Sequence, residues 1–142
     1  MMLAFKEGGD KPPIQIGIVR ATPLLTLEQM EAMTKNVEAI VIITFATGTV
    51  PDRLGPIVQA KVEAGVPVFL VSNNPGDDVG ILRDKYLPQA NFRDAGAIRI
   101  ESVNINRIEE VFAAIQEEAA KGKRGGQLGA AVEQRFLREE PQ

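Results

Sequence analysis

Short apolar runs alternate with segments of helical periodicity along this chain. The strongest run is AIVII at Ala39–Ile43, and an unbroken apolar run rich in β-branched residues is typical of a strand buried on both faces of a parallel sheet. Similar runs predict strands at residues 14–19, 68–71 and 97–100. We expect the first of these near the middle of the sheet. The last is half polar, so we expect it at an edge.

Helical spacing of apolar residues fills the intervals between the strands. Thr26 is followed three residues later by Gln29, a pair that resembles a capping box and predicts a helix over residues 27–35. Residues 52–64 also have helical spacing, and Gly65 stands where a glycine commonly ends a helix. The order of elements is therefore strand, helix, strand, helix, strand.

The second half of the chain contains three more helical segments. Residues 79–94 predict a bent or split helix, because a proline interrupts them. Asn104 or Asn106 is the expected cap of a long amphipathic helix, which ends in a basic turn at residues 121–126, and residues 128–137 form another amphipathic segment. The apolar stripe of the long helix consists of Ile105, Ile108, Val111, Phe112 and Ile115.

Alternating strands and helices predict an α/β fold. We expect a three-layer α/β/α sandwich around a four-stranded parallel sheet, flavodoxin-like or Rossmann-like, with right-handed crossovers and strand order 2-1-3-4. Residues 1–13 are expected to be a leader or linker, residues 14–121 the α/β domain, and residues 122–142 a C-terminal helical extension.

Composition removes several classes of chemistry. The 142 residues include no cysteine and no histidine, which excludes disulfides, thiolate metal sites and the usual general base. A net charge of −3 argues against binding to DNA, and no apolar run is long enough to span a membrane. We therefore expect a cytoplasmic protein with no cofactor and no resident metal.

Polar loops follow the predicted strands at the edge where open α/β folds bind ligands. The candidate ligand-binding residues are Thr22, Thr47, Gly48, Thr49, Ser72, Asn73, Asn74, Asp77 and Asp78. The threonines of this set and Thr44 also suit a turn whose hydroxyls cap the next helix, and no neighbouring base is present to activate them. Asp77, Asp78 and Asp84 offer oxygen ligands for a divalent cation, but their spacing is not that of a calcium loop, and solvated turn carboxylates are the simpler interpretation.

The order of these features resembles the smaller C-terminal domain of the L-asparaginase/glutaminase family, which includes the amidase subunit that acts on misacylated glutamine-specific tRNA. The resemblance extends over residues 14–118. It is carried by AIVIITFATGTVP at residues 39–51, EAGVPV at residues 63–68 and DAGAI at residues 94–98.

The resemblance implies a domain without its own catalytic residues. The family's threonine nucleophiles lie in a large N-terminal domain, in motifs of the type TGGTIA and HGTDT, and neither motif is present here. The turn asparagine that bacterial members lend to a neighbouring active site corresponds to Thr49, which cannot present both ends of an amide. The acidic partner would be one of Asp77, Asp78 and Asp84. Residues 101–107 depart from the family pattern GDLxxxKA.

Three functions remain open on this sequence. The first is a stand-alone asparaginase C-terminal-like domain, an accessory or oligomerising subunit or half of a split amidohydrolase. Its expected partner is a second copy or a catalytic N-terminal-type domain. The second is a binding module for a small amino acid or amide, which would use the loops at the carboxyl ends of the strands. The third is a complete small enzyme, which the missing histidine and cysteine disfavour.

Overall fold

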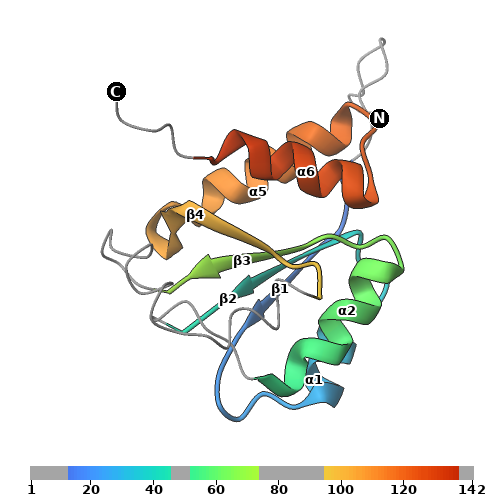
Figure 1. The fold of residues 1–142 in the computed structure, drawn as a ribbon, viewed down its shortest axis with the longest axis vertical. Helices are drawn as coiled ribbons and strands as arrows, with labels where there is room; N and C mark the ends of the chain where they lie inside the picture. The colour runs from blue at the N-terminus through green and yellow to red at the C-terminus, as the bar shows by residue number, and fades with distance from the viewer. Residues whose placement is uncertain (1–12, 46–51, 74–94, 138–142) are drawn as a thin grey trace, which may run out of the picture.

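Four parallel strands form a sheet that lies between two layers of helices in the computed structural model (Figure 1). The structure describes residues 13–45, 52–73 and 95–137. The strands are β1 (Ile16–Arg20), β2 (Ala39–Ile43), β3 (Val68–Ser72) and β4 (Ile98–Asn104). The helices are α1 (Leu27–Met33), α2 (Gly55–Glu63), α5 (Ile108–Ala120) and α6 (Gly125–Arg135), with short 3-10 turns η1 (Asp52–Leu54) and η2 (Ile105–Arg107). The predicted α/β sandwich with a parallel sheet is confirmed.

The strand order is β1-β2-β3-β4, so the predicted order 2-1-3-4 is wrong in the placement of the first strand. All five residues of β2 and all five of β3 are buried, whereas burial alternates with exposure along β1. An all-apolar strand needs a neighbour on each side and a helix layer on each face, which only an inner position supplies. β1 contains Gly17 and Arg20 and tolerates an edge. The expectation that the fourth strand lies at an edge is confirmed.

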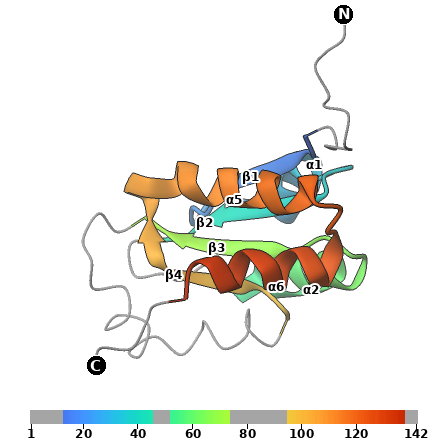
Figure 2. The same ribbon diagram turned by 90° about the horizontal axis from the view of Figure 1, so that it is seen from above.

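Each face of the sheet has its own hydrophobic core. Ile40 and Ile42 point to the side of α1 and α2, while Ala39 and Val41 point to the side of α5 and α6. This division follows from the strand geometry, because successive side chains leave a strand on opposite faces. Figure 1 shows α5 and α6 on one side of the sheet and α1 and α2 on the other, and Figure 2 shows the strands side by side in the order β1-β2-β3-β4.

Helix α1 begins as the sequence predicts. The Thr26 hydroxyl accepts a hydrogen bond from the Gln29 backbone N–H at 3.0 Å, and the Gln29 side chain accepts one from the Thr26 N–H at 2.9 Å. The capping box is therefore confirmed. After α2, Gly65 has a φ of +90°, a left-handed conformation in which other residues are strained.

The predicted asparagine cap of the long helix is wrong. Asn104 is the last residue of β4 and Asn106 lies within η2, so α5 begins only at Ile108, with Arg107 as its N-cap. The Arg107 side chain makes no capping hydrogen bond; it donates to the Glu110 carboxylate at 2.7 and 2.8 Å. Pairing with β3 extends β4 to Asn104, beyond the expected end at residue 100, so the helix begins later in the sequence than predicted. The predicted stripe still packs on the sheet through Val111 and Ile115.

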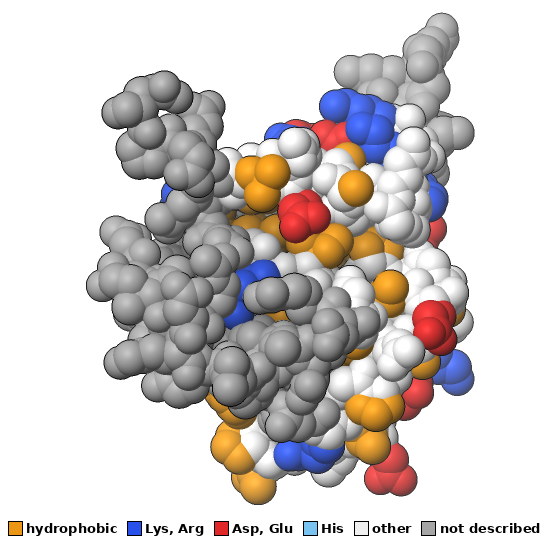
Figure 3. Space-filling model, in the orientation of Figure 1, with side chains coloured by type: hydrophobic (Ala, Val, Ile, Leu, Met, Phe, Trp, Pro, Cys, Tyr) orange, Lys and Arg blue, Asp and Glu red, His pale blue; other side chains and the backbone are white. Residues whose placement is uncertain are grey.

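A buried carboxylate joins α5 to α6. Glu118 has a side chain only 6% exposed, and it accepts hydrogen bonds from Lys123 at 2.7 Å, Arg135 at 3.3 Å and Lys121 at 3.4 Å. Basic and acidic side chains lie next to one another over this end of the two helices (Figure 3). The hydrogen bond from Lys123 and the charge of Lys121 hold the pKa of Glu118 below its ordinary value of 4.5, although burial acts in the opposite direction.

The Glu118 interactions predict an acid-sensitive contribution to stability. Because the folded-state pKa is lowered, the contribution is fully present above about pH 4.5 and is lost as the pH falls through the folded-state value. We expect Glu118→Gln to lower the melting temperature at neutral pH, and the difference from wild type to shrink in acid. Thermal melts followed by circular dichroism from about pH 7 to about pH 3 measure this.

Glu117→Gln is the matched control for that experiment. The Glu117 side chain is 59% exposed and forms an ion pair with Arg135 alone among the described residues. Its replacement should therefore have a smaller effect at neutral pH. A difference between wild type and Glu118→Gln that stays constant across the pH series would contradict the assigned role of Glu118.

Candidate functional site

The carboxyl ends of β1, β2 and β3 lie side by side at one end of the sheet. We call this end the C-terminal edge, to distinguish it from the lateral edges formed by β1 and β4. Backbone pairing continues one residue beyond two of the strands, because the Ala21 N–H donates to Ile43 O and the Thr44 N–H donates to Val71 O, each at 2.8 Å. The polar residues that follow these strands are thereby placed side by side. This edge is the candidate functional site, at the position where open α/β sheets bind ligands.

Three of the predicted site residues lie within the described part of the chain, and the structure brings them to this edge. Ser72 is 4% exposed at the end of β3, and Asn73 follows it half-buried. Thr22 lies just beyond β1 and is exposed. Thr44, between them, is 2% exposed and donates its hydroxyl to the Phe45 carbonyl at 2.9 Å. That bond stays within the turn and does not cap α2, whose N-cap Leu54 carries no side-chain hydrogen bond.

The other predicted site residues lie outside the described residues. They are Thr47, Gly48, Thr49, Asn74, Asp77, Asp78 and the alternative acid Asp84. Their roles stay predictions. The predicted bent helix over residues 79–94 also falls outside.

Arg53 is a residue that the sequence analysis did not single out, and its side chain holds the loop after β1 in place. Its guanidinium Nη2 donates to the Pro23 carbonyl at 2.8 Å and to the Leu25 carbonyl at 2.5 Å. These bonds tie the loop after β1 to the turn that precedes α2. No sequence pattern predicts these contacts, because Arg53 is 30 positions from Pro23 and 28 from Leu25.

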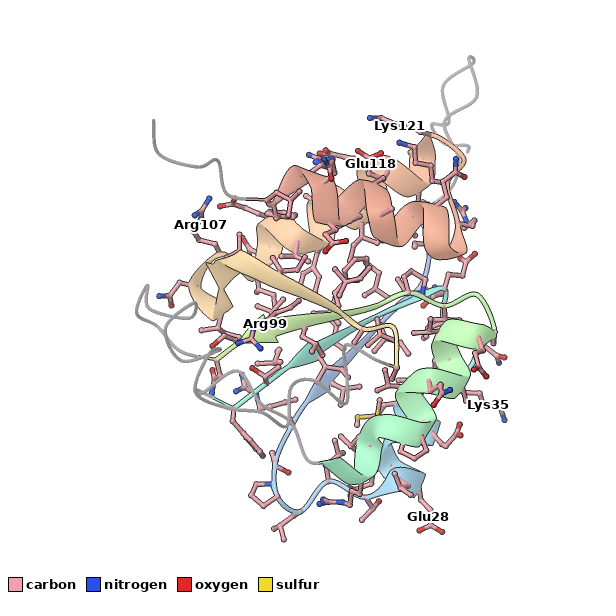
Figure 4. All side chains as sticks on the ribbon, viewed as in Figure 1. Glu28, Lys35, Arg99, Arg107, Glu118 and Lys121 are labelled. Atoms are coloured by element: carbon pink, nitrogen blue, oxygen red, sulfur yellow. The ribbon has the colours of Figure 1, made fainter. Side chains whose placement is uncertain are left out.

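Arg99 is a second residue that the sequence analysis did not single out. It lies in β4 opposite Leu70, is half-buried, and its side chain leaves the sheet on the side of α1 and α2 (Figure 4). It interacts with neighbouring groups and is not a free cation. The sequence feature that could have drawn attention to Arg99 is a single charged residue within the otherwise apolar run AIRI at residues 97–100. The register shift between β3 and β4 also pairs Ser72 with Asn104 at the same edge.

The described part of this edge offers hydroxyl and amide groups. Such groups orient a polar ligand by hydrogen bonds, but a threonine or serine nucleophile also needs a neighbouring base. Across residues 13–45, 52–73 and 95–137, no three acidic side chains cluster closely enough to hold a metal ion. Within those same residues, no helix is long and apolar enough to cross a membrane.

Comparisons with known proteins identify the fold. No family model matches the sequence, and no curated protein sequence matches it. Among solved structures, the thermostable L-asparaginase from Thermococcus kodakarensis matches with a TM-score of 0.68 and 16% identity. L-asparaginase I from Vibrio cholerae O1 biovar eltor str. N16961 matches with a TM-score of 0.67 and 21% identity.

These matches define an asparaginase-like α/β domain. Each covers 84% of this chain, so the likeness extends over most of the sandwich. Each covers 36% of the asparaginase, so this chain spans about a third of the length of these enzymes. At identities this low the likeness concerns the fold, and function has to be argued from the site.

Proposed function

We propose that this chain is a non-catalytic domain of the asparaginase C-terminal type, serving as an accessory or oligomerising subunit or as half of a split amidohydrolase. The observation that carries the proposal is the partial match: 84% of this chain resembles 36% of two L-asparaginases. The chemistry of the described edge supports it, since acyl transfer from an amide needs an activated nucleophile and a stabilised oxyanion. The relation to the tRNA-dependent amidase subunit rests on the sequence resemblance alone.

The proposal includes a partner. A domain that forms a third of a larger enzyme leaves surface that another polypeptide can cover. We propose that the partner is a second copy of this chain or a separate catalytic domain of the N-terminal type. We also place the protein in the cytoplasm, which cell fractionation would test.

The purified chain is expected to release no ammonia from asparagine or glutamine. The measurement is a coupled ammonia assay on the chain alone, with a bacterial L-asparaginase as the positive control. Ammonia release that disappears in the variant Thr49→Ala would show that the chain is an enzyme and would overturn the proposal. Release that persists unchanged in Thr49→Ala would point to a contaminant, to be removed before the assay is repeated.

A binding module for a small amino acid or amide is the second candidate, because the described polar residues that end or follow β1, β2 and β3 lie at one edge of the sheet. The same samples distinguish it. A ligand that binds only the native state raises the free energy of unfolding, by about 2.7 kcal/mol when its concentration is a hundred times its Kd. The melting temperature rises as a result. A saturable rise with asparagine, glutamine or their acids, without ammonia release, would favour the binding module. An unchanged melting temperature would favour the accessory domain.

A further inference from the structure

Helix α6 is the last element of the described chain, and its composition is unfavourable for a helix. Its 11 residues include Gly125, Gly126 and Gly129, and glycine is among the least favourable residues in a helix. Its N-cap residue, Arg124, makes no capping hydrogen bond with its side chain. A helix this short and this rich in glycine is unstable by itself in water. We therefore expect α6 to stay helical only while it is docked on the sandwich.

The docking of α6 uses a small apolar surface. Leu128 and Val132 are both 0% exposed, and Gly129 lies directly on the sheet, since a Cβ atom there would be 2.7 Å from Ile98 Cδ1 and 3.4 Å from Pro67 Cβ. Helix α6 thus covers β4 and the residue before β3, beside α5 (Figure 2). It buries three residues, whereas α5 buries five.

The turn before α6 is fixed to the rest of the domain. The Arg124 guanidinium donates to the Ala119 carbonyl at 2.8 Å and forms an ion pair with Glu38 at 3.5 Å. Gly125 and Gly126 follow at once, and Gly125 has a φ of +60°. Two adjacent glycines allow large changes in backbone direction. They are therefore the hinge about which α6 can move while the turn stays in place.

The other end of α6 is held by one charged side chain. Arg135, the last residue of the helix, forms ion pairs with Glu117 at 2.7 Å and Glu118 at 3.3 Å, both on α5. Among the ion pairs of the described residues, only those of Arg135 join α6 to another element. The carboxylate of Glu118 lies where the two helices meet (Figure 4). Arg135 is therefore the polar contact that opposes movement about the glycines.

We infer that α6 opens as a unit, moving about Gly125 and Gly126 and releasing Arg135 from α5, while the sheet stays folded. Opening breaks no strand pairing, because no strand of the described chain follows α6. The core under α1 and α2 contains no residue of α6, so the C-terminal edge stays in place. The open state exposes Ile98 and the apolar side of α6. This motion is independent of the proposed function.

The test uses one introduced thiol as a reporter, because the chain contains no cysteine. Val132→Cys places the thiol in α6 and Val41→Cys places it in β2; both valines are 0% exposed and belong to the same core. A thiol-modifying reagent reaches either position only when the surrounding structure opens. We expect Val132→Cys to be labelled about tenfold faster or more. Its rate should depend less steeply on urea, since local opening exposes less surface than unfolding.

Two replacements, each combined with each reporter, identify the parts that move. Arg135→Gln should raise both labelling rates about two- to fivefold, because only the closed state loses ion pairs. Val58→Ala, in the core under α1 and α2, destabilises the closed and the open state equally. It should raise the labelling of Val41→Cys about tenfold and leave Val132→Cys unchanged. Glu133→Gln, which removes an exposed charge of α6, is the control for Arg135→Gln and should change neither rate.

A replacement that favours the helix should have the opposite effect. Among the described residues, nothing outside the backbone of α6 lies within 4 Å of where a Cβ atom on Gly126 would begin. Gly126→Ala therefore fits the closed state and raises helix propensity. We expect it to slow the labelling of Val132→Cys about two- to fivefold.

Equal labelling rates with equal urea dependence for the two thiols would show that α6 unfolds only with the whole domain, and would overturn the inference. Faster labelling of Val132→Cys in the presence of Val58→Ala would overturn it as well. Rates unchanged by Arg135→Gln would overturn the role of Arg135. If Val132→Cys fails to fold, hydrogen exchange of the wild type decides. Amides of α6 that exchange faster than those of β2, with weak dependence on urea, would support the opening, and equal protection would overturn it.

Discussion

Replacing Ile42 with aspartate is expected to abolish the cooperative unfolding transition of the domain. Ile42 is 0% exposed on the inner strand β2, where it pairs with Val19 and Leu70 within the core under α1 and α2. A carboxylate there has no partner and costs several kcal/mol. The total stability of such a domain is about 5–15 kcal/mol. Ile40→Asp, on the same strand and the same face, should behave alike.

Thermal and urea unfolding followed by circular dichroism test this expectation. Leu24→Asp is the matched control, since it makes the same kind of replacement at a side chain that is 85% exposed. That variant should melt close to the wild type. A cooperative melt of both β2 variants at the wild-type temperature would show that β2 does not hold the centre of the sheet.

Replacing Phe69 with alanine is expected to destabilise the other core by about 3–5 kcal/mol. Phe69 is 0% exposed on β3 and packs in the cluster beneath α5 and α6, which also contains Val41 and Ile115. The truncated side chain would leave a cavity that the flanking strands cannot close. The melting temperature should fall by roughly 10–15 °C.

Phe112→Ala serves as the comparison, because Phe112 is a partly buried phenylalanine packed against the same cluster. Its truncation should cost less, since solvent can fill part of the space. The midpoints of guanidinium unfolding, with the slope checked for constancy, give both values. Equal losses for the two variants would contradict the difference in burial between Phe69 and Phe112.

The two cores have different consequences for function. The core under α1 and α2 supports the turns on either side of the candidate site, where Arg53 joins the loop after β1 to the start of α2. The core under α5 and α6 lies on the other face of the sheet, where Glu118 of α5 forms ion pairs with Lys123 and with Arg135 of α6. Variants in the second core therefore change stability without altering residues of the candidate site. Association and ligand binding can be measured in these variants to show whether either property changes when only the stability of the domain changes.

Local patterns in the sequence determined the elements and the fold class. The run AIVII gave β2 with its predicted bounds, and the pair Thr26 and Gln29 predicted the start of α1. These features depend on residues close in sequence, so propensity and capping suffice to predict them. The placement of Thr22 and Ser72 at one edge followed as well, because parallel strands bring their carboxyl ends together.

Only the tertiary structure decided which strand lies at the edge and where β4 ends. The composition of β1 tolerates an edge without requiring one, so its place in the strand order was decided by how the strands pair in the folded sheet. The bonds from Arg53 to Pro23 and Leu25 join parts of the chain that no local pattern connects. Asn104 stayed in β4 because pairing with Ser72 outweighed its capping preference. Backbone pairing between strands that are distant in sequence overrides the local preferences of single residues here, because each pairing adds hydrogen bonds that exist only in the folded sheet.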